Sequence, residues 1–233
     1  MDVGSTPERR GVITDLVRRG IYALPAAGVL TALPWVFIFG NSPDIKTDPE
    51  GYARSLTSTG NAVGSYLYLA GLICLLFGLL ALYGYLARTR ASSWAGGGMI
   101  VSVVGIALAL PVFGILGLAD AVLADVYLAG HKDVSAAMPL LAGGSFSNRI
   151  IAYIGVFLRI SLIGAIAYAM AVWKSGSLPK WAGVLVAAGF ALSMTLSPFV
   201  AWVGALCLVI GGVWLARSIN QAEGGQQVPG AAH

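Results

Sequence analysis

Charged residues are scarce in this chain. Only 10% of the 233 residues are Asp, Glu, Lys or Arg, whereas 58% are hydrophobic. Soluble domains ordinarily contain about 25% charged residues, and a soluble globule of this size could not cover its surface with so few. The composition excludes a soluble enzyme, a disordered tail and a DNA-binding domain as first interpretations. It predicts an all-helical membrane protein without a nucleic-acid partner.

Cysteine and histidine are scarcer still. The two cysteines, Cys74 and Cys207, both lie in apolar segments and form no C-x-x-C motif. The two histidines, His131 and His233, lie in a predicted loop and at the last position. A disulfide scaffold, a bis-histidine haem site and a zinc site of clustered ligands are therefore excluded. We predict neither a metal nor another cofactor.

Long charge-free runs locate the predicted membrane spans, since a bilayer core needs about 20 apolar helical residues. The last such run, residues 181–216, is 36 residues long and contains Ser197-Pro198 at its middle. Because the residue before a proline resists helix, this run predicts two spans with a turn between them. A further apolar segment is interrupted only by Arg159. The six predicted spans are about 21–40, 65–87, 97–119, 150–173, 181–196 and 198–216.

Lys and Arg are distributed unevenly between the two sides of these spans. With the N-terminus inside, nine lie on the inner side and four on the outer side. Cytoplasmic loops carry the excess of positive charge, so both termini are predicted to be cytoplasmic. Residues 1–20 have the pattern of an amphipathic helix on the inner membrane surface, with a basic face. Residues 217–233 are predicted to form a flexible cytoplasmic tail.

The two long outer loops contain helix signals. Thr47 and Glu50 have the spacing of a capping box and predict a short helix around residues 48–58. In the second loop, residues 120–129 are expected to continue the third span, and a short apolar helix is expected near residues 134–142. The outer side is therefore predicted to carry helical structure beyond the bilayer.

Three short motifs punctuate the ends of predicted spans. They are Gly51-Tyr52-Ala53-Arg54, Leu178-Pro179-Lys180-Trp181-Ala182-Gly183 and the run from Gly211 to Arg217. With these motifs and its layout, the chain resembles the uncharacterised six-helix integral membrane proteins of bacteria. The resemblance implies a multi-pass protein of the bacterial inner membrane. It implies no activity and no functional residues.

Arg159 is the strongest single candidate for a site. An arginine ten residues into a span is expected near the midplane, where it costs at least about 2.5–3.5 kcal/mol, so it should face the bundle. The predicted spans contain no carboxylate to pair with it. Its candidate partners are the hydroxyls of Ser193, Thr195 and Ser197 and the carbonyls freed by Pro111 and Pro198. Asp120 and Asp125 are partners only if water penetrates from outside. Arg159 then either ties broken helices together or binds an anionic group, such as a lipid phosphate or a carboxylate substrate.

Asp120 and Asp125 are acidic candidates at the outer end of the third span. Paired carboxylates can perform acid–base chemistry, but at a helix mouth they are more often solvated. Small residues spaced four apart on the third, fifth and sixth spans predict close helix packing, within the chain or in a homo-oligomer. These residues are Gly97, Gly105, Ala109, Gly183, Ala187, Ala191, Thr195, Ala201 and Ala205.

Three functions are compatible with this sequence. The first is a non-catalytic bundle that binds or associates within the membrane, with lipids as partners. The second is a small transporter or ligand-binding bundle that uses Arg159 and helices broken by proline. The third is a membrane-embedded enzyme acting on an apolar, isoprenoid-like substrate with Asp120, Asp125 or Glu50 as the acid.

Overall fold

The computed structural model describes residues 15–37, 43, 47–114, 119–133, 145–193 and 198–224, and every regular element among them is helical. Residues 15–20 form a helical turn that leads into the first long helix. The helices are α2 (Ala23–Phe37), α3 (Pro49–Leu56), α4 (Thr59–Leu86), α5 (Ser92–Gly114), α6 (Asp120–Leu128), α7 (Ser145–Ser175), α8 (Lys180–Ser193) and α9 (Pro198–Gly224).

Four segments are long and apolar enough to cross a membrane. They are Asp15–Trp35, Thr59–Leu86, Ser92–Pro111 and Phe199–Ala222. α8 is apolar but shorter, with 14 residues. Because a stretch of about 18 or more apolar residues is the signature of a spanning helix, these segments indicate that the chain is a helical membrane protein.

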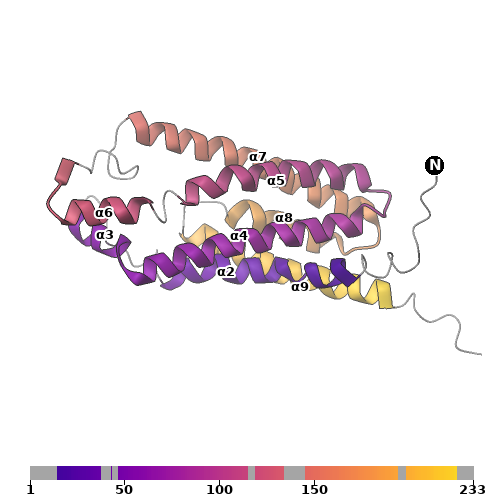
Figure 1. Ribbon diagram of the computed structural model, residues 1–233. Coiled ribbons are helices and arrows are strands. Elements are labelled where there is room, and N and C mark those ends of the chain that lie inside the picture. Colours follow the sequence, from indigo (N-terminus) through magenta and orange to yellow (C-terminus); the bar gives the residue numbers. More distant parts are fainter. Residues whose placement is uncertain are drawn as a thin grey trace, which may run out of the picture.

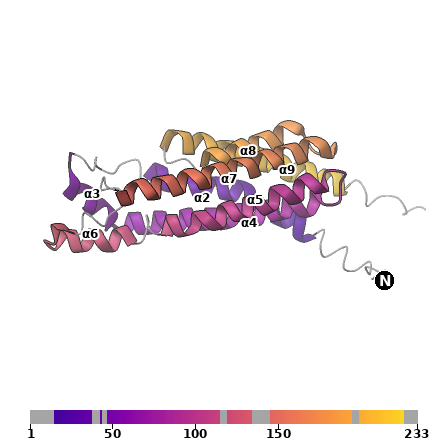
Figure 2. The same cartoon turned by 90° about the horizontal axis from the view of Figure 1, so that it is seen from above.

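Apart from the short helices α3 and α6, the helices form a closed ring in chain order: α2, α4, α5, α7, α8 and α9. Each packs against the helix before it and the helix after it, and α9 returns to pack against α2. Figures 1 and 2 show these helices running side by side, with α3 and α6 together at one end of the bundle. The start of α2 and the end of α9 lie at the opposite end (Figure 1).

Glycines bring neighbouring helices of the ring close together. A Cβ atom on Gly189 of α8 would lie 2.6 Å from the backbone nitrogen of Leu208 in α9. Between α5 and α7 the contact is reciprocal, because Gly164 faces Ser102 and Gly105 faces Ser161. Most of the predicted small-residue faces thus pack inside the chain. Gly97 is the exception, since it is exposed and a Cβ there would meet no atom within 4 Å.

Two buried tyrosines cross the interior of the ring. The Tyr68 hydroxyl on α4 donates to the Ser193 carbonyl at the end of α8 at 2.9 Å. The Tyr168 hydroxyl on α7 donates to the Leu79 carbonyl on α4 at 2.9 Å. Both side chains are at most 3% exposed. α4 is therefore bonded to two helices on the far side of the ring.

Several predicted boundaries can be compared with these helices. α8 and α9 are separate helices, as Ser197-Pro198 predicts, although residues 194–197 lie outside the described residues. α9 continues to Gly224, well into the segment predicted to be a flexible tail. The first 14 residues, the predicted helix at 134–142 and residues 225–233 also lie outside the described part.

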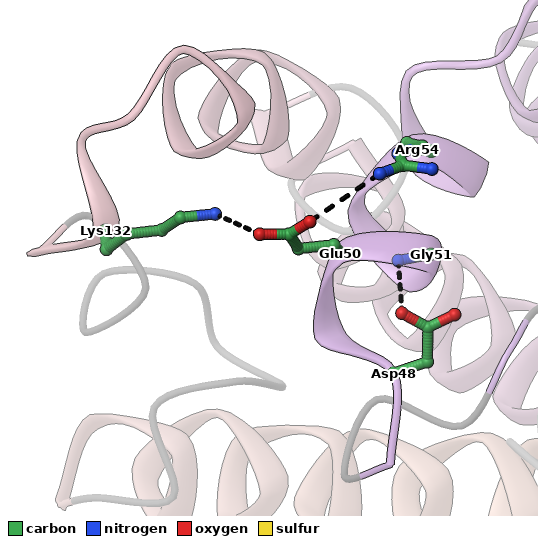
Figure 3. Close-up of polar contacts among 5 residues, drawn as sticks. All are labelled: Asp48, Glu50, Gly51, Arg54 and Lys132. Atoms are coloured by element: carbon green, nitrogen blue, oxygen red, sulfur yellow. Dashed lines mark hydrogen bonds and ion pairs between the residues drawn. The ribbon is translucent and has the colours of Figure 1, made fainter.

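The short outer helix is present as α3, but its cap differs from the prediction. The N-cap is Asp48, whose Oδ1 accepts a hydrogen bond from the Gly51 amide at 2.8 Å (Figure 3). Pro49 follows at the first helical position, where it loses no helical hydrogen bond. The capping box expected from Thr47 is therefore replaced by a cap one residue later.

Candidate functional site

α7 presents an apolar outward face, and Arg159 lies on it. Val156, Ile163 and Ile166 are each more than half exposed, and Arg159 is exposed among them at helical spacing. The prediction that Arg159 faces the bundle is therefore wrong. The sequence could not reveal this, because α7 is apolar on several faces and the 3.6-residue period does not single out the inward one.

The hydroxyl partners predicted for Arg159 are engaged elsewhere or lie outside the described residues. Ser193 is 2% exposed. Its hydroxyl donates to the Phe190 carbonyl at 3.0 Å, and its carbonyl accepts from Tyr68. No hydrogen bond joins Arg159 and Ser193 in the part of the chain that the structure describes. Thr195 and Ser197 are not among those residues.

Aromatic side chains mark two levels along α7. Trp173 is 46% exposed near its end, and Tyr153 is 42% exposed near its start. The Tyr153 hydroxyl donates to the Leu108 carbonyl of α5 at 3.3 Å. These residues are 20 positions apart, which is about 30 Å of helix and equals the thickness of a bilayer core. Exposed aromatics at that separation are typical of the two interfaces of a spanning helix.

The position of Arg159 follows from these two levels. It lies six residues from Tyr153, which is about 9 Å, and 14 residues from Trp173, which is about 21 Å. Helical side chains generally lean toward the helix N-terminus, which for Arg159 is the direction of Tyr153. Along the helix, Arg159 is therefore nearer to Tyr153 than to Trp173, and its midplane depth stays a prediction.

Basic and aromatic residues gather at the Trp173 end of the ring. The Lys174 ammonium lies 4.2 Å from the ring centroid of Trp94, and the Lys180 ammonium lies 5.0 Å from that of Trp173. Arg90 Nε donates to the Lys174 carbonyl at 2.9 Å. Arg90 therefore joins the α4–α5 connection to the end of α7, and Lys174 and Lys180 contact exposed aromatic rings at this end.

Asp120 and Asp125 have different surroundings, although both lie on α6. Asp120 is 2% exposed, and its Oδ1 has no hydrogen-bond partner among the described residues. Burial raises the pKa of this carboxyl to about 6. Asp125 is exposed. The structure therefore separates the two acidic candidates into one buried group and one solvated group.

The short helices α3 and α6 form a small assembly together with Lys132, which follows α6 (Figure 3). We call this assembly the α3–α6 unit. The Lys132 ammonium donates to Glu50 Oε1 at 2.8 Å, and Arg54 lies 3.6 Å from the other oxygen of the same carboxylate. The Lys132 hydrogen bond and charge lower the pKa of Glu50. All three side chains are about half exposed or more, so Glu50 is a surface carboxylate and differs from Asp120.

Tyr153 is the residue of this site that sequence reasoning missed. Its signal is its spacing, because it lies 20 residues before Trp173 with one charged residue between them. The burial of Asp120 could not be found in the same way, since it depends on how α6 packs against α3.

Comparison of the chain with protein-family models, curated proteins and solved structures gives no match.

Proposed function

We propose that this chain is a non-catalytic, six-span protein of the bacterial inner membrane that binds the phosphate of a membrane lipid through Arg159. In this proposal α7 and α8 are the fourth and fifth spans, beside the four candidate spans. The observation that carries it is the outward, exposed position of Arg159 on an otherwise apolar face of α7.

The placement of basic residues supports the proposed orientation. Arg18 donates to Asn220 near the end of α9, and Arg90 donates to the Lys174 carbonyl. These groups belong to the end predicted to be cytoplasmic, whereas Lys132 belongs to the α3–α6 unit at the other end. Positive charge concentrates on the cytoplasmic side of membrane proteins. Both termini are accordingly assigned to the cytoplasm.

Energetics favour a phosphate as the partner of Arg159. An arginine left in hydrocarbon costs at least about 2.5–3.5 kcal/mol, and the arginine side chain lowers this cost by extending to the interface. In this proposal the guanidinium extends toward the Tyr153 level, and local thinning of the bilayer brings a lipid phosphate down to meet it. Two parallel charge-assisted hydrogen bonds join guanidinium and phosphate groups. The site therefore consists of Arg159 on α7 and lipid phosphate in the leaflet at its N-terminal end.

Ser193 has no part in this site, because its hydroxyl and carbonyl are already hydrogen-bonded within the ring. Most small-residue faces are likewise used between helices of the same chain. Leu162, Ile163 and Ile166, the next exposed residues of α7 after Arg159, are apolar and suit lipid chains. Binding within the membrane is thus assigned to lipid rather than to a polar substrate in the ring interior.

The test is thermal unfolding of the detergent-solubilised protein with short-chain phosphatidylglycerol added. We expect the lipid to raise the midpoint of the wild type and to leave that of Arg159→Met nearly unchanged. Arg159→Lys should retain part of the shift, since lysine keeps the charge but lacks the bidentate fork. Diacylglycerol, which has no phosphate, should produce no shift that depends on Arg159.

Two controls separate this site from general charge effects and from free anions. Arg217→Met removes one exposed arginine at the opposite end of the ring and should keep most of the lipid shift. Inorganic phosphate distinguishes a soluble anion from a lipid, and it should stabilise the wild type much less than the lipid does. Equal stabilisation of the wild type and Arg159→Met by phosphatidylglycerol would contradict the proposal.

A further inference from the structure

The α3–α6 unit has its own small apolar interior. Ala53 and Leu56 of α3 pack with Ala124 and Tyr127 of α6 in a cluster separate from the ring core. Each of these four side chains is at most 9% exposed. Figure 1 shows the two helices side by side beyond the ends of α4 and α5. The unit is therefore held by few apolar contacts, outside the candidate spans.

Asp120 belongs to the buried side of this unit. It lies four residues before Ala124 and seven before Tyr127, so the three share the helix face that packs against α3. Asp125 is five residues further along, about 140° around the helix, and is exposed. Of the two aspartates of α6, only Asp120 thus lies on the helix face that contacts α3.

The surroundings of Asp120 offer little to stabilise a negative charge. Its Oδ1 has no hydrogen-bond partner among the described residues. Tyr52 of α3 is close enough that the Asp120 charge contributes to raising the tyrosine pKa, after burial. The other charged groups of α3, Glu50 and Arg54, pair at the surface together with Lys132.

We propose that the α3–α6 unit is a proton-controlled latch, closed when Asp120 is neutral and released when its carboxyl is ionised. A neutral carboxyl can remain in the apolar contact at a much smaller cost than an ionised one. An ionised carboxylate there has no counter-charge among the described residues, and burying an unpaired charge is strongly unfavourable. Separation of α6 from α3 gives the carboxylate access to water. This inference is independent of lipid binding at Arg159.

The direction of the pH effect follows from the difference in proton affinity. The Asp120 pKa is raised from 3.8 to about 6 in the closed unit, chiefly by burial. The closed state therefore binds more protons than the open one between these values. Its stability is greatest below the ordinary aspartate pKa and falls as the pH rises through about 6. Glu50 stays ionised over most of this range, because Lys132 lowers its pKa.

Cysteine accessibility measures the opening directly. Ala124 is fully buried in the contact, and Val122 is 64% exposed on the same helix. Each is replaced by cysteine in the full chain carrying Cys74→Ala and Cys207→Ala. The ratio of thiol-labelling rates, Ala124→Cys to Val122→Cys, corrects for the effect of pH on thiol reactivity. We expect this ratio to increase roughly 30-fold from pH 4.5 to pH 7.5.

Two further variants assign the effect to one carboxyl. Asp120→Asn keeps the shape but cannot ionise, so labelling at position 124 should stay slow at every pH. Asp125→Asn changes a solvated carboxyl on the same helix and should leave the wild-type profile unchanged. The proposal would be overturned if the labelling ratio did not change with pH in the protein that keeps Asp120. It would also be overturned if the pH dependence persisted in Asp120→Asn.

Discussion

The ring and the α3–α6 unit are held together by different means. Ring helices approach through glycines and buried side chains, and tyrosine hydroxyls bond across the interior. The α3–α6 unit has a small apolar cluster, an exposed Glu50–Lys132 pair and one buried carboxyl. Close packing is insensitive to pH and salt, whereas surface charges and ionisable groups respond to both. The α3–α6 unit is therefore the part of the molecule suited to respond to its surroundings.

The largest expected effect comes from filling a close contact of the ring. In Gly189→Val, the new Cβ would lie within 2.7 Å of backbone atoms of Gly204 and Leu208, which cannot move aside as a flexible side chain could. Overpacking typically costs about 1–3 kcal/mol and sometimes more, and we expect at least about 3 kcal/mol here. Thermal unfolding in detergent measures the loss.

Gly97→Ala is the matched control for this substitution. Gly97 is also a helical glycine, but a Cβ there would meet no atom within 4 Å. Alanine favours helix over glycine by about 0.5–1 kcal/mol, so this variant should be neutral or slightly more stable. Equal destabilisation by the two substitutions would show that the α8–α9 approach does not limit the stability of the ring.

A smaller effect is expected from the cross-ring tyrosines. Ser193 is 2% exposed, so water does not replace the tyrosine donor of its carbonyl. Tyr68→Phe should therefore cost about 1–3 kcal/mol. Tyr168→Phe should cost only about 1 kcal/mol, because Leu79 lies inside α4, where its carbonyl also accepts a helical bond. Chemical denaturation of both variants in mild detergent tests this order.

The smallest effect is expected at the outer ion pair. Glu50→Gln removes the charge from a surface contact with Lys132, and such pairs contribute little because water and salt screen them. The midpoint of ring unfolding should not change. Labelling at Ala124→Cys should become modestly faster at low ionic strength, and the difference should vanish in high salt. A lowered midpoint for the whole ring would show that the two regions are coupled through this pair.

Some features of this structure are readable from the sequence because they depend on neighbouring residues. Ser197-Pro198 predicts the break between α8 and α9, and Pro49 marks the first turn of α3. These signals come from backbone restrictions that operate whatever the remainder of the chain does. The same holds for the apolar runs that indicate a membrane protein.

The features that the sequence does not reveal depend on which helix face meets a neighbour. Arg159 lies in a segment with apolar residues on both its buried and exposed faces, so the pattern does not tell whether it points inward. Asp120 and Asp125 are both aspartates of α6, and the sequence does not tell which of them lies on the face that packs against α3. Tertiary contacts between helices distant in sequence determine both outcomes.

The closed ring has a consequence for the order in which the protein is assembled. α9 is the final helix of the ring along the chain, and it packs against both α8 and α2. Until α9 has been synthesised and inserted, glycine-lined surfaces on α2 and α8, including Gly28 and Gly189, have no partner. Translation therefore produces an open arc of helices that closes only when α9 is added. Until then, the glycine-lined surfaces at the two ends of this arc are open to contacts with other proteins.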